Sequence, residues 1–370
     1  MHIFFVISNN SSVPYFKWFA ERAANHKEYK FTFVALTDER PEMIEDVGGY
    51  GFDCIWIKFD VKKRKRSMVR TFFKMSSILR NVKPDVVHTH LFDDGLPCMI
   101  AAWFSNIKIR VHTKQSTAFH WYYSPKAVPF DRLINRLATN LVAVSEECKL
   151  FVLNKEKAQP QKVEMIHHGI PVDFFSTPNE QYCKELIRKF DLEGKLVLGT
   201  VSRLIEWKGY KYIIAAAVKV VKRYHNARFL FVGTGPQEEE LKELVAKHDL
   251  EKHVVFTGWI SREYIPSLYS ILDGYVHAAS YEPFGFVIPE AMMSGTPVVS
   301  TPTGSALDVI EHKENGFLAE YQDVDTLVEG IEFIIKNGNE LGSKGKVKSV
   351  DMFDFNRMYD SYIRLYLKNK

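Results

Sequence analysis

The chain has 370 residues, of which 46% are hydrophobic and 25% charged, with a formal net charge of +4. This composition is that of a globular protein, the length favours two domains, and the charge is too small to indicate a nucleic-acid-binding protein. No run of 18 apolar residues is present to span a membrane, and the four cysteines lack metal-binding spacing. We therefore expect a cytoplasmic protein with reduced thiols and no metal site.

The first half of the chain alternates apolar runs of strand length with segments of helix length, which predicts a parallel sheet built from βαβ units. The opening sequence, MHIFFVISNNSS, has no basic segment before its apolar core, so it predicts a first strand rather than a signal peptide. The strands expected here are His2–Ile7, Phe31–Leu36, Asp53–Ile57, Asp85–Thr89, Ile107–Thr113, Asn140–Val144 and Val163–Ile166.

Residues 61–75, VKKRKRSMVRTFFKM, contain seven Lys or Arg and no acidic residue. One interpretation is a helix whose apolar face is core and whose basic end is solvated. The other is contact with anionic lipid at the inner face of the membrane, where each basic residue contributes about 1 kcal/mol. The basic residues concerned are Lys62, Lys63, Arg64, Lys65 and Arg66. The apolar residues at helical spacing are Met68, Val69, Phe72, Phe73, Met75, Ile78 and Leu79.

A second series of strands begins after residues 167–181, where Gly169, Pro171 and Pro178 interrupt regular structure. We expect this segment to link two domains, residues 1–170 and residues 171–352. The strands expected in the second domain are Leu196–Val201, Arg228–Val232, His253–Thr257, Asp273–His277 and Pro297–Ser300.

The segment from Gly199 to Gly209, GTVSRLIEWKG, predicts a buried strand that ends in a loop carrying Arg203 and Lys208. Ligands of open parallel sheets bind at the carboxyl ends of the strands. Two permanent cations at such a place suit a diphosphate, although loop Lys and Arg side chains are more often simply solvated.

The segment from Tyr281 to Val299, YEPFGFVIPEAMMSGTPVV, is the most informative in the chain. A helix starting near Phe286 would present its first N–H groups to an anion. Glu290 lies about one turn into that helix, and Glu282 precedes it. The amides would bind phosphates and the carboxylates would accept from sugar hydroxyls, a combination that suits a sugar nucleotide. The alternative is a surface helix with acidic residues at its start, which the helix dipole favours.

These two segments, with FVGTGP (231–236), HVVFTGWI (253–260) and PDVVHTHL (84–91), resemble the retaining glycosyltransferases of the GT-B fold, and more narrowly glycosyltransferase family 4. The resemblance is strong over residues 196–317, weaker over residues 83–168, and poor over the first 80 residues. It implies two Rossmann-like α/β domains that face each other across a cleft. The first would take the acceptor and the second the nucleotide sugar.

The resemblance also implies roles for individual residues. Glu290 would hold the ribose hydroxyls, Glu282 would face the donor sugar, and Arg203 and Lys208 would hold the diphosphate. Further donor-binding positions follow from the matching motifs, with the base near residues 258–260. They are Phe284, Gly285, Phe286, Val287, Gly233, Ile260 and Asn9.

By the same resemblance, the reaction is a hexosyl transfer with retention of configuration and without a metal. The donor would be a nucleoside diphosphate sugar, most commonly a UDP-sugar in this family, with a GDP-sugar as the alternative. The acceptor would be a glycan or a lipid-linked glycan of cell-surface polysaccharide synthesis, such as capsule or lipopolysaccharide.

The first domain departs from the family pattern. The loop after the first strand, SNNSSVP (8–14), has no glycine, and Asn9 or Asn10 would take its place because Asn tolerates positive φ. The family histidine falls near residues 115–116, so His120 is the nearest catalytic candidate and His112 the next. The residues that end or follow the PDVVHTH strand are either solvated or placed to orient an acceptor hydroxyl. They are His88, His90, Asp93 and Asp94.

Residues 353–370 form one helical stripe of apolar side chains. In GT-B proteins a terminal helix crosses back onto the first domain, and the alternative is a helix that caps its own domain. The stripe consists of Phe355, Met358, Tyr359, Tyr362, Ile363 and Tyr366.

Two other functions compete with the transferase. A sugar-nucleotide epimerase would need acid and base carboxylates around the sugar, which the 282–290 pattern fits less well. A non-catalytic sugar-nucleotide-binding partner subunit is suggested by the missing glycines and the displaced histidine. The presence of Arg203, Lys208, Glu282 and Glu290 argues against it.

Overall fold

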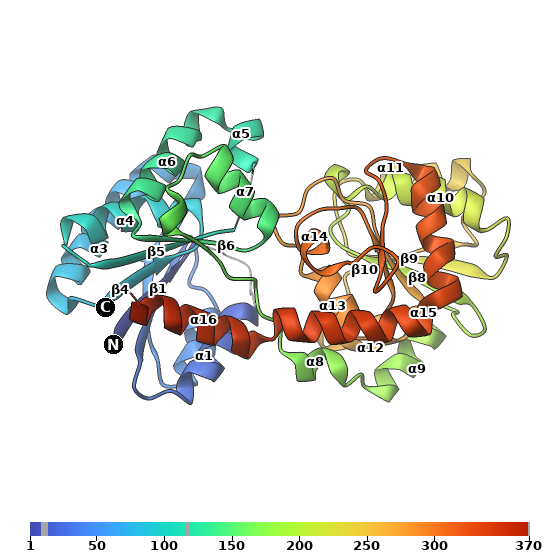
Figure 1. The fold of residues 1–370 in the computed structure, drawn as a ribbon, viewed down its shortest axis with the longest axis horizontal. Helices are drawn as coiled ribbons and strands as arrows, with labels where there is room; N and C mark the ends of the chain where they lie inside the picture. The colour runs from blue at the N-terminus through green and yellow to red at the C-terminus, as the bar shows by residue number, and fades with distance from the viewer. Residues whose placement is uncertain (9–13, 116–117, 369–370) are drawn as a thin grey trace. The chain divides into compact units, whose positions relative to one another are not determined.

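The computed structural model describes residues 1–8, 14–115 and 118–368 (Figure 1). Asn9 and Asn10, expected to replace the family's glycine, lie outside the described residues. The contacts divide the chain into two compact units, Met1–His167 with Asn356–Lys370, and His168–Phe355. The expected boundaries, after residues 170 and 352, fall three residues from these divisions. Each unit is described by itself.

The first unit contains a seven-stranded sheet in which every pair of neighbours is parallel, in the order β3-β2-β1-β4-β5-β6-β7. Its central strands β1, β4 and β5 are almost entirely buried because helices cover both faces of the sheet. The strands are β1 (His2–Ile7), β2 (Lys30–Thr37), β3 (Asp53–Lys58), β4 (Val86–Thr89), β5 (Ile109–Lys114), β6 (Asn140–Ala143) and β7 (Val163–Met165).

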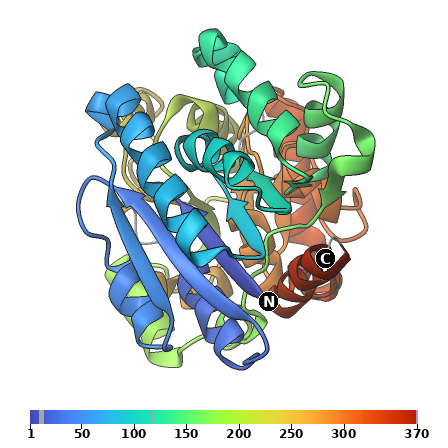
Figure 2. The ribbon, with the colours of Figure 1, turned by 90° about the vertical axis from the view of Figure 1, so that its left-hand side faces the viewer.

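The main helices of this unit lie on both faces of the sheet, with α3 (Arg64–Val82) and α4 (Phe92–Phe104) on one face and α1 (Pro14–Ala24) and α16 (Phe355–Lys368) on the other (Figure 2). Shorter helices follow β2, β5 and β6. They are α2 (Met43–Gly48), α5 (Phe119–Tyr123), α6 (Val128–Leu137) and α7 (Glu146–Asn154).

Helix α16 places its apolar stripe in the core of the first unit. Tyr359 packs on Phe19 of α1, with 5.1 Å between ring centroids. The Tyr366 hydroxyl lies 2.6 Å from His88 Nδ1, and the Tyr362 hydroxyl lies 3.2 Å from Thr113 Oγ1. The terminal stripe therefore belongs to the first unit and does not cap the second.

The second unit contains a six-stranded parallel sheet in the order β10-β9-β8-β11-β12-β13. The strands are β8 (Leu196–Val201), β9 (Ala227–Val232), β10 (Val254–Gly258), β11 (Gly274–His277), β12 (Val298–Ser300) and β13 (Phe317–Leu318). The helices are α8 (Val172–Ser176), α9 (Glu180–Lys189), α10 (Tyr210–Val220), α11 (Glu238–Lys247), α12 (Ile265–Ser270), α13 (Val287–Met293), α14 (Ser305–Val309) and α15 (Val324–Phe353).

In both sheets, the second and third strands of the unit lie successively on one side of the first strand. The fourth strand lies on the other side of the first. This is the strand order of Rossmann-like domains, and it creates a crevice where the direction of winding reverses. Every expected strand is present within two residues of its expected limits, except that β13 was missed because it is only two residues long. The expected α/β fold with two parallel-sheet domains is confirmed.

Candidate active site

The charged residues of the second unit lie at its point of reversal. Strands β8 and β11 are neighbours in the sheet, although their connections run in opposite directions. Strand β8 ends at Val201 and is followed by Arg203 and Lys208. Strand β11 ends at His277 and is followed by Glu282. Ligands of this fold bind at the carboxyl ends of these two strands.

Glu282 lies at the centre of this group. Its carboxylate forms an ion pair with the Lys208 ammonium and lies 3.3 Å from His277 Nε2. The side chains of Lys208 and Glu282 are 15% and 9% exposed. Burial by itself raises the pKa of Glu282, but His277 and Lys208 outweigh that effect and lower the pKa to about 2. Glu282 is therefore a carboxylate throughout the physiological range.

The loops that carry these residues are tied together. Lys208 ends a short 3₁₀ turn, Glu206–Lys208, and Ser280 N donates to Trp207 O at 2.8 Å. The bond joins the loop after β8 to the loop after β11. The cation and the carboxylate are therefore held at fixed positions, which is the property required of a preorganised site.

Glu290, on α13, makes a different set of contacts. Arg262 Nη2 donates to its Oε1 at 2.8 Å, and the Tyr269 hydroxyl donates to its Oε2 at 3.3 Å. Burial raises the pKa of Glu290, although both partners act against that effect. The ring of Tyr269 packs edge-to-face on Tyr275, with 5.7 Å between centroids, and the Tyr275 hydroxyl lies 3.5 Å from His277 Nδ1. Buried side chains therefore connect the surroundings of the two carboxylates.

The loop before α13 is held in place by the segment that follows β12. Gly304 has φ of 51°, and a Cβ there would lie 2.6 Å from Phe284 O. Ser305 N donates to the same oxygen at 2.6 Å. The Phe284 side chain is buried against the rings of His168, Phe286 and Phe353. Gly285 and Val287 stand at the start of α13, where the helix N–H groups lack partners within the helix.

The remaining donor-binding candidates surround this group. Arg203 is exposed, and no ion pair among the described residues involves it. Gly233 follows β9, and a Cβ there would lie 2.1 Å from Ser202 O, so only glycine permits this close approach. Ile260 follows β10 and is half-buried. Asn9 lies outside the described residues.

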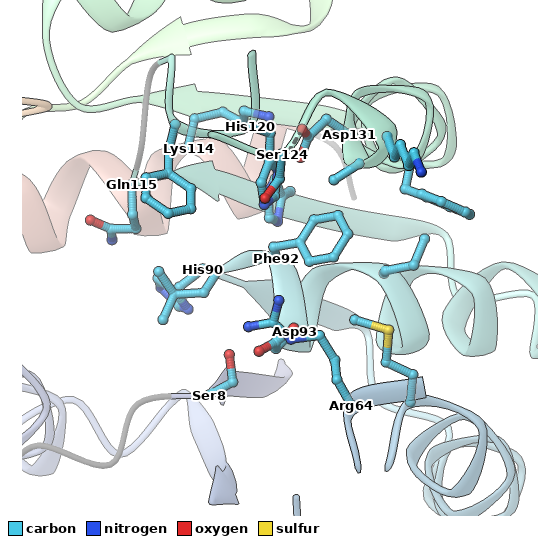
Figure 3. Close-up of a pocket in the computed structure, with 18 of the residues that line it drawn as sticks. Ser8, Arg64, His90, Phe92, Asp93, Lys114, Gln115, His120, Ser124 and Asp131 are labelled. Carbon is cyan, nitrogen blue, oxygen red and sulfur yellow. Dashed lines mark hydrogen bonds and ion pairs between the residues drawn. The ribbon is translucent and has the colours of Figure 1, made fainter. Parts of the chain in front are cut away.

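The first unit has a cavity of about 790 Å³, lined entirely by its own residues (Figure 3). It lies at the corresponding point of reversal, because Ser8 follows β1 and His90 and Asp93 follow β4. Lys114 and Gln115, at the end of β5, also line it. Helices α3, α4, α5 and α6 supply the other walls.

Most charged groups of this cavity are paired with one another. Arg64 Nε lies 3.1 Å from Asp93 Oδ1, and Lys114 Nζ lies 2.8 Å from Glu156 Oε2. His120, the catalytic candidate, lines the cavity, and its Nδ1 donates to Asp131 Oδ2 at 2.8 Å (Figure 3). The Asp131 contact orients the imidazole, which leaves Nε2 for other partners.

The other candidates of the first domain separate into two groups. His90, His112 and Asp93 line the cavity. His88 does not, because its two ring nitrogens contact Tyr366 and Thr113 in the core. Asp94 is also structural. It accepts from Ser8 N and from His90 N, at 3.0 Å and 2.7 Å, and so fixes the ends of β1 and β4 relative to each other.

Three polar residues of these sites were not predicted from the sequence. His277 is the last residue of β11, Arg262 begins a short 3₁₀ turn far from Glu290 in sequence, and Asp131 lies within an amphipathic helix. Only His277 had a local signal, since it is the last residue of the strand that precedes Glu282. In the part of the chain that the structure describes, no group of three or more His, Cys, Asp or Glu side chains is arranged to hold a metal ion. Among the same residues, no helix is both long and apolar enough to cross a membrane.

Two family models match consecutive parts of the chain. Residues 19–174 match Glycosyltransferase Family 4, and residues 184–346 match Glycosyl transferases group 1. Together with the fold of two Rossmann-like units, these two matches indicate a glycosyltransferase of the GT-B class. The chain is a GT-B glycosyltransferase similar to the group 1 and family 4 enzymes.

Individual proteins agree with this assignment. The chain is 28% identical over 281 residues to an uncharacterized glycosyltransferase of Methanocaldococcus jannaschii, covering 73% of this chain and 71% of that protein. It is 24% identical over 310 residues to the UDP-Gal:alpha-D-GlcNAc-diphosphoundecaprenol alpha-1,3-galactosyltransferase of Escherichia coli, covering 81% and 79%. The crystal structure of Anabaena HepE in complex with UDP superposes with a TM-score of 0.84 at 18% identity, covering 100% of both chains.

Proposed function

We propose that the chain transfers a sugar from a UDP-sugar to a hydroxyl group of a glycan or a lipid-linked glycan, with retention of configuration and without a metal ion. The observation that carries the proposal is the group formed by Lys208, Glu282 and His277, beside the exposed Arg203, at the β8–β11 reversal. Support for UDP comes from HepE, whose structures contain UDP or UDP-glucose. Support for the acceptor comes from the named substrate of the Escherichia coli relative.

The proposed chemistry follows from where charge develops. As the bond between the anomeric carbon and the diphosphate breaks, negative charge grows on the leaving phosphate. Arg203, Lys208 and the first amides of α13 are the groups to stabilise it. Glu282 faces the donor sugar, Glu290 accepts from the ribose hydroxyls, and residues 258–260 contact the base. In the first unit, His120 is the candidate to contact the reacting groups.

Because Lys208 is paired with Glu282, Lys208 and Arg203 do not contribute equally to binding the diphosphate. The Lys208 ammonium already has an anionic partner, so a diphosphate must share it with Glu282. Arg203 is exposed and gains a phosphate without losing a protein ion pair. Arginine also presents two parallel donors to a phosphate, which lysine does not. Arg203 is therefore the main diphosphate ligand in this proposal.

Incubation of the purified protein with a panel of UDP-sugars tests the reaction. We expect slow release of UDP in the absence of acceptor and faster release when a suitable acceptor is added. Formation of an epimeric sugar nucleotide would instead identify an epimerase. Binding without any turnover of any donor would identify a non-catalytic sugar-nucleotide binder.

We also propose that the enzyme docks on anionic membrane at the cytoplasmic face through the start of α3. Residues Lys62–Arg66 are all exposed, and the first turn of α3 contains no acidic residue. The start of a helix carries partial positive charge, and the basic residues add to it. The start of α3 is therefore strongly positive and suits an anionic membrane surface. Val69 and Phe73, expected among the apolar stripe of α3, are 58% and 65% exposed. They add an apolar contact beside the basic residues.

Sedimentation with vesicles tests this docking. We expect the protein to sediment with vesicles that contain phosphatidylglycerol, and less so as salt is raised. A variant with Lys62, Lys63, Arg64, Lys65 and Arg66 neutralised should remain in solution. Equal sedimentation of that variant would remove the membrane from the proposal and leave the transferase function untouched.

A further inference from the structure

Glu290 is almost completely enclosed for a carboxylate that is proposed to bind a ligand. Its side chain is 4% exposed, and burial raises its pKa. A buried carboxyl group favours its protonated form unless a cation or hydrogen-bond donors stabilise the charge. The ionised form accepts about four hydrogen bonds, whereas in the protonated form one oxygen donates instead. The ability of Glu290 to accept from two ribose hydroxyls therefore depends on its ionisation.

Arg262 supplies the positive charge that favours ionisation of Glu290. Its Nη2 donates to Glu290 Oε1 at 2.8 Å, and the Tyr269 hydroxyl donates to Oε2 at 3.3 Å. Both partners lower the pKa of Glu290, Arg262 more than Tyr269. Tyr269 and Tyr275 are neutral near pH 7, because burial raises their pKa well above the ordinary 10.0. The two hydrogen bonds leave about half of the accepting positions of the carboxylate for a ligand.

The guanidinium group of Arg262 is held by aromatic rings. It lies 6.0 Å from the ring centroid of Phe174 and 5.5 Å from that of Phe175, both on α8. The face of an aromatic ring attracts a cation. Phe175 is fully buried, and its ring centroid lies 6.4 Å from that of Tyr269. The same ring therefore contacts both donors that bind Glu290.

The elements that carry the ion pair are anchored as well. Tyr264, in the same 3₁₀ turn as the arginine, stacks on Tyr182 of α9 with 4.0 Å between ring centroids. The Ser294 hydroxyl lies 3.2 Å from Phe175 O and 3.0 Å from Glu290 O, which connects α8 to α13. The ion pair is therefore held by the packing of α8, α9 and α13 around it.

We infer that Arg262 is a positioning residue that holds Glu290 as an oriented carboxylate, so that both ribose hydroxyls can donate to it. Arg262 acts through the carboxylate and does not itself contact the nucleotide. The inference rests on the proposed function. It adds to that function the residue by which the second unit selects a ribonucleoside diphosphate over the 2′-deoxy form.

The pH dependence of nucleotide binding tests this role. In Arg262→Met the carboxyl group loses its cation, so its pKa rises further and it is protonated at a higher pH. We expect a preference for UDP over 2′-deoxy-UDP of about tenfold when Glu290 is ionised. This preference should disappear as the pH is lowered, and at a higher pH in Arg262→Met than in the wild type. Both nucleotides carry the same diphosphate, so its own titration cancels in the comparison.

Two further variants separate positioning from direct contact. Arg262→Lys keeps a cation and should restore a pH profile close to that of the wild type. In the Glu290→Gln background, Arg262→Met should change UDP affinity by less than about twofold, because the group on which it acts is absent. A larger loss in that background would show that the guanidinium contacts the nucleotide, which would overturn the inference. If Arg262→Met does not fold alone, this double variant, which leaves no buried charge unpaired, decides the question.

Melting curves recorded without nucleotide test the ion pair independently of the proposed function. A carboxyl group whose pKa is raised on folding costs stability as the pH rises through that folded pKa, and Arg262→Met should enlarge this cost. The melting temperature of Arg262→Met should therefore lie further below that of the wild type near pH 8 than near pH 5. Adding Glu290→Gln should abolish this pH dependence.

The outcomes distinguish the inference from the proposed function. A wild type that prefers UDP over 2′-deoxy-UDP, with the same pH midpoint in Arg262→Met, would overturn the inference and leave the proposed function intact. A difference in melting temperature that does not depend on pH would also overturn it. Failure of the wild type to bind UDP would remove the proposed function, and the role in ribose selection with it, whatever the melting curves show.

Discussion

The two units share a strand order and place their sites at the same topological position, yet the two sites have opposite chemistry. In the second unit, a cation, a carboxylate and a histidine are in contact at the ends of β8 and β11, and Arg203 is exposed on the loop after β8. In the first unit, the ends of β1 and β4 border an apolar cavity whose charges are mostly paired. The order of strands therefore fixes where a ligand binds, and the loop residues decide which ligand it is.

A buried lysine–glutamate pair occurs in each unit and offers a direct way to test this contrast. Lys208 pairs with Glu282, and Lys114 pairs with Glu156, which also accepts from Asn135 at 2.6 Å. We expect Lys208→Met and Lys114→Met each to lower the free energy of unfolding by about 3 kcal/mol, because a carboxylate is left buried without its cation. Urea denaturation measures both. Only Lys208→Met should also weaken UDP binding.

The pH dependence sharpens this prediction for Glu282. Its pKa in the folded chain is about 2, below the ordinary 4.5. The carboxylate therefore stabilises the fold above pH 4.5, and that contribution is lost as the pH falls towards 2. Without Lys208 the pKa of Glu282 rises, so in Lys208→Met the acid-dependent loss of stability should be smaller and should be complete at a higher pH. Identical acid-unfolding curves for wild type and variant would contradict the role assigned to this ion pair.

Arg203→Ala should affect rate rather than stability. The side chain is exposed, so its removal should leave the melting temperature unchanged. Loss of a donor to developing negative charge typically lowers turnover by about a hundredfold or more. UDP release under saturating donor measures this effect. Arg188→Ala, an exposed arginine on α9 of the same unit, is the matched control and should keep wild-type turnover.

Glu290→Gln tests the contact to the ribose. We expect UDP affinity to fall about tenfold, since a hydrogen bond to a charged acceptor contributes about 1.5 kcal/mol or more. Calorimetry with UDP and 2′-deoxy-UDP isolates that bond. The wild type should prefer UDP, and the variant should bind both alike. A preserved preference in Glu290→Gln would mean that Arg262 and Tyr269 fully occupy this carboxylate.

The smallest expected effect lies in the core of the first unit. Tyr366→Phe removes the hydroxyl 2.6 Å from His88 Nδ1 and should lower the free energy of unfolding by about 1 kcal/mol. UDP affinity should not change, because the residue belongs to the other unit. Thermal denaturation and UDP titration of the same sample check both statements. A change in UDP affinity would show that the two units do not act separately.

The candidate site of the second unit can be proposed from the sequence because its residues are close together along the chain. Arg203 and Lys208 are five positions apart, and Glu282 and Glu290 eight, each set beside a recognisable strand or helix start. The residues that contact these side chains are not predicted from spacing, since Arg262 reaches Glu290 from the 3₁₀ turn after β10. Sequence spacing reports neighbours along one element, whereas such a pair depends on the packing of two elements.

The cavity of the first unit could not be predicted in the same way. Its walls come from the ends of β1, β4 and β5 and from four helices, and no short motif contains them. His120 was found as a candidate, but its partner Asp131 was not. Helical periodicity also predicts the apolar stripe on α3 without showing which of its residues are buried. Met75 and Leu79 are buried as core, whereas Val69 and Phe73 are exposed, and periodicity alone does not show which part of a stripe is covered.

The way in which α16 completes the first unit has a consequence for biosynthesis. The buried rings of Tyr359, Tyr362 and Tyr366 come from the part of the chain that leaves the ribosome after the whole second unit. Domains generally fold in the order in which they are translated. Here the second unit has its complete sequence first. The core around Phe19 and His88 is therefore completed only after translation has supplied α16.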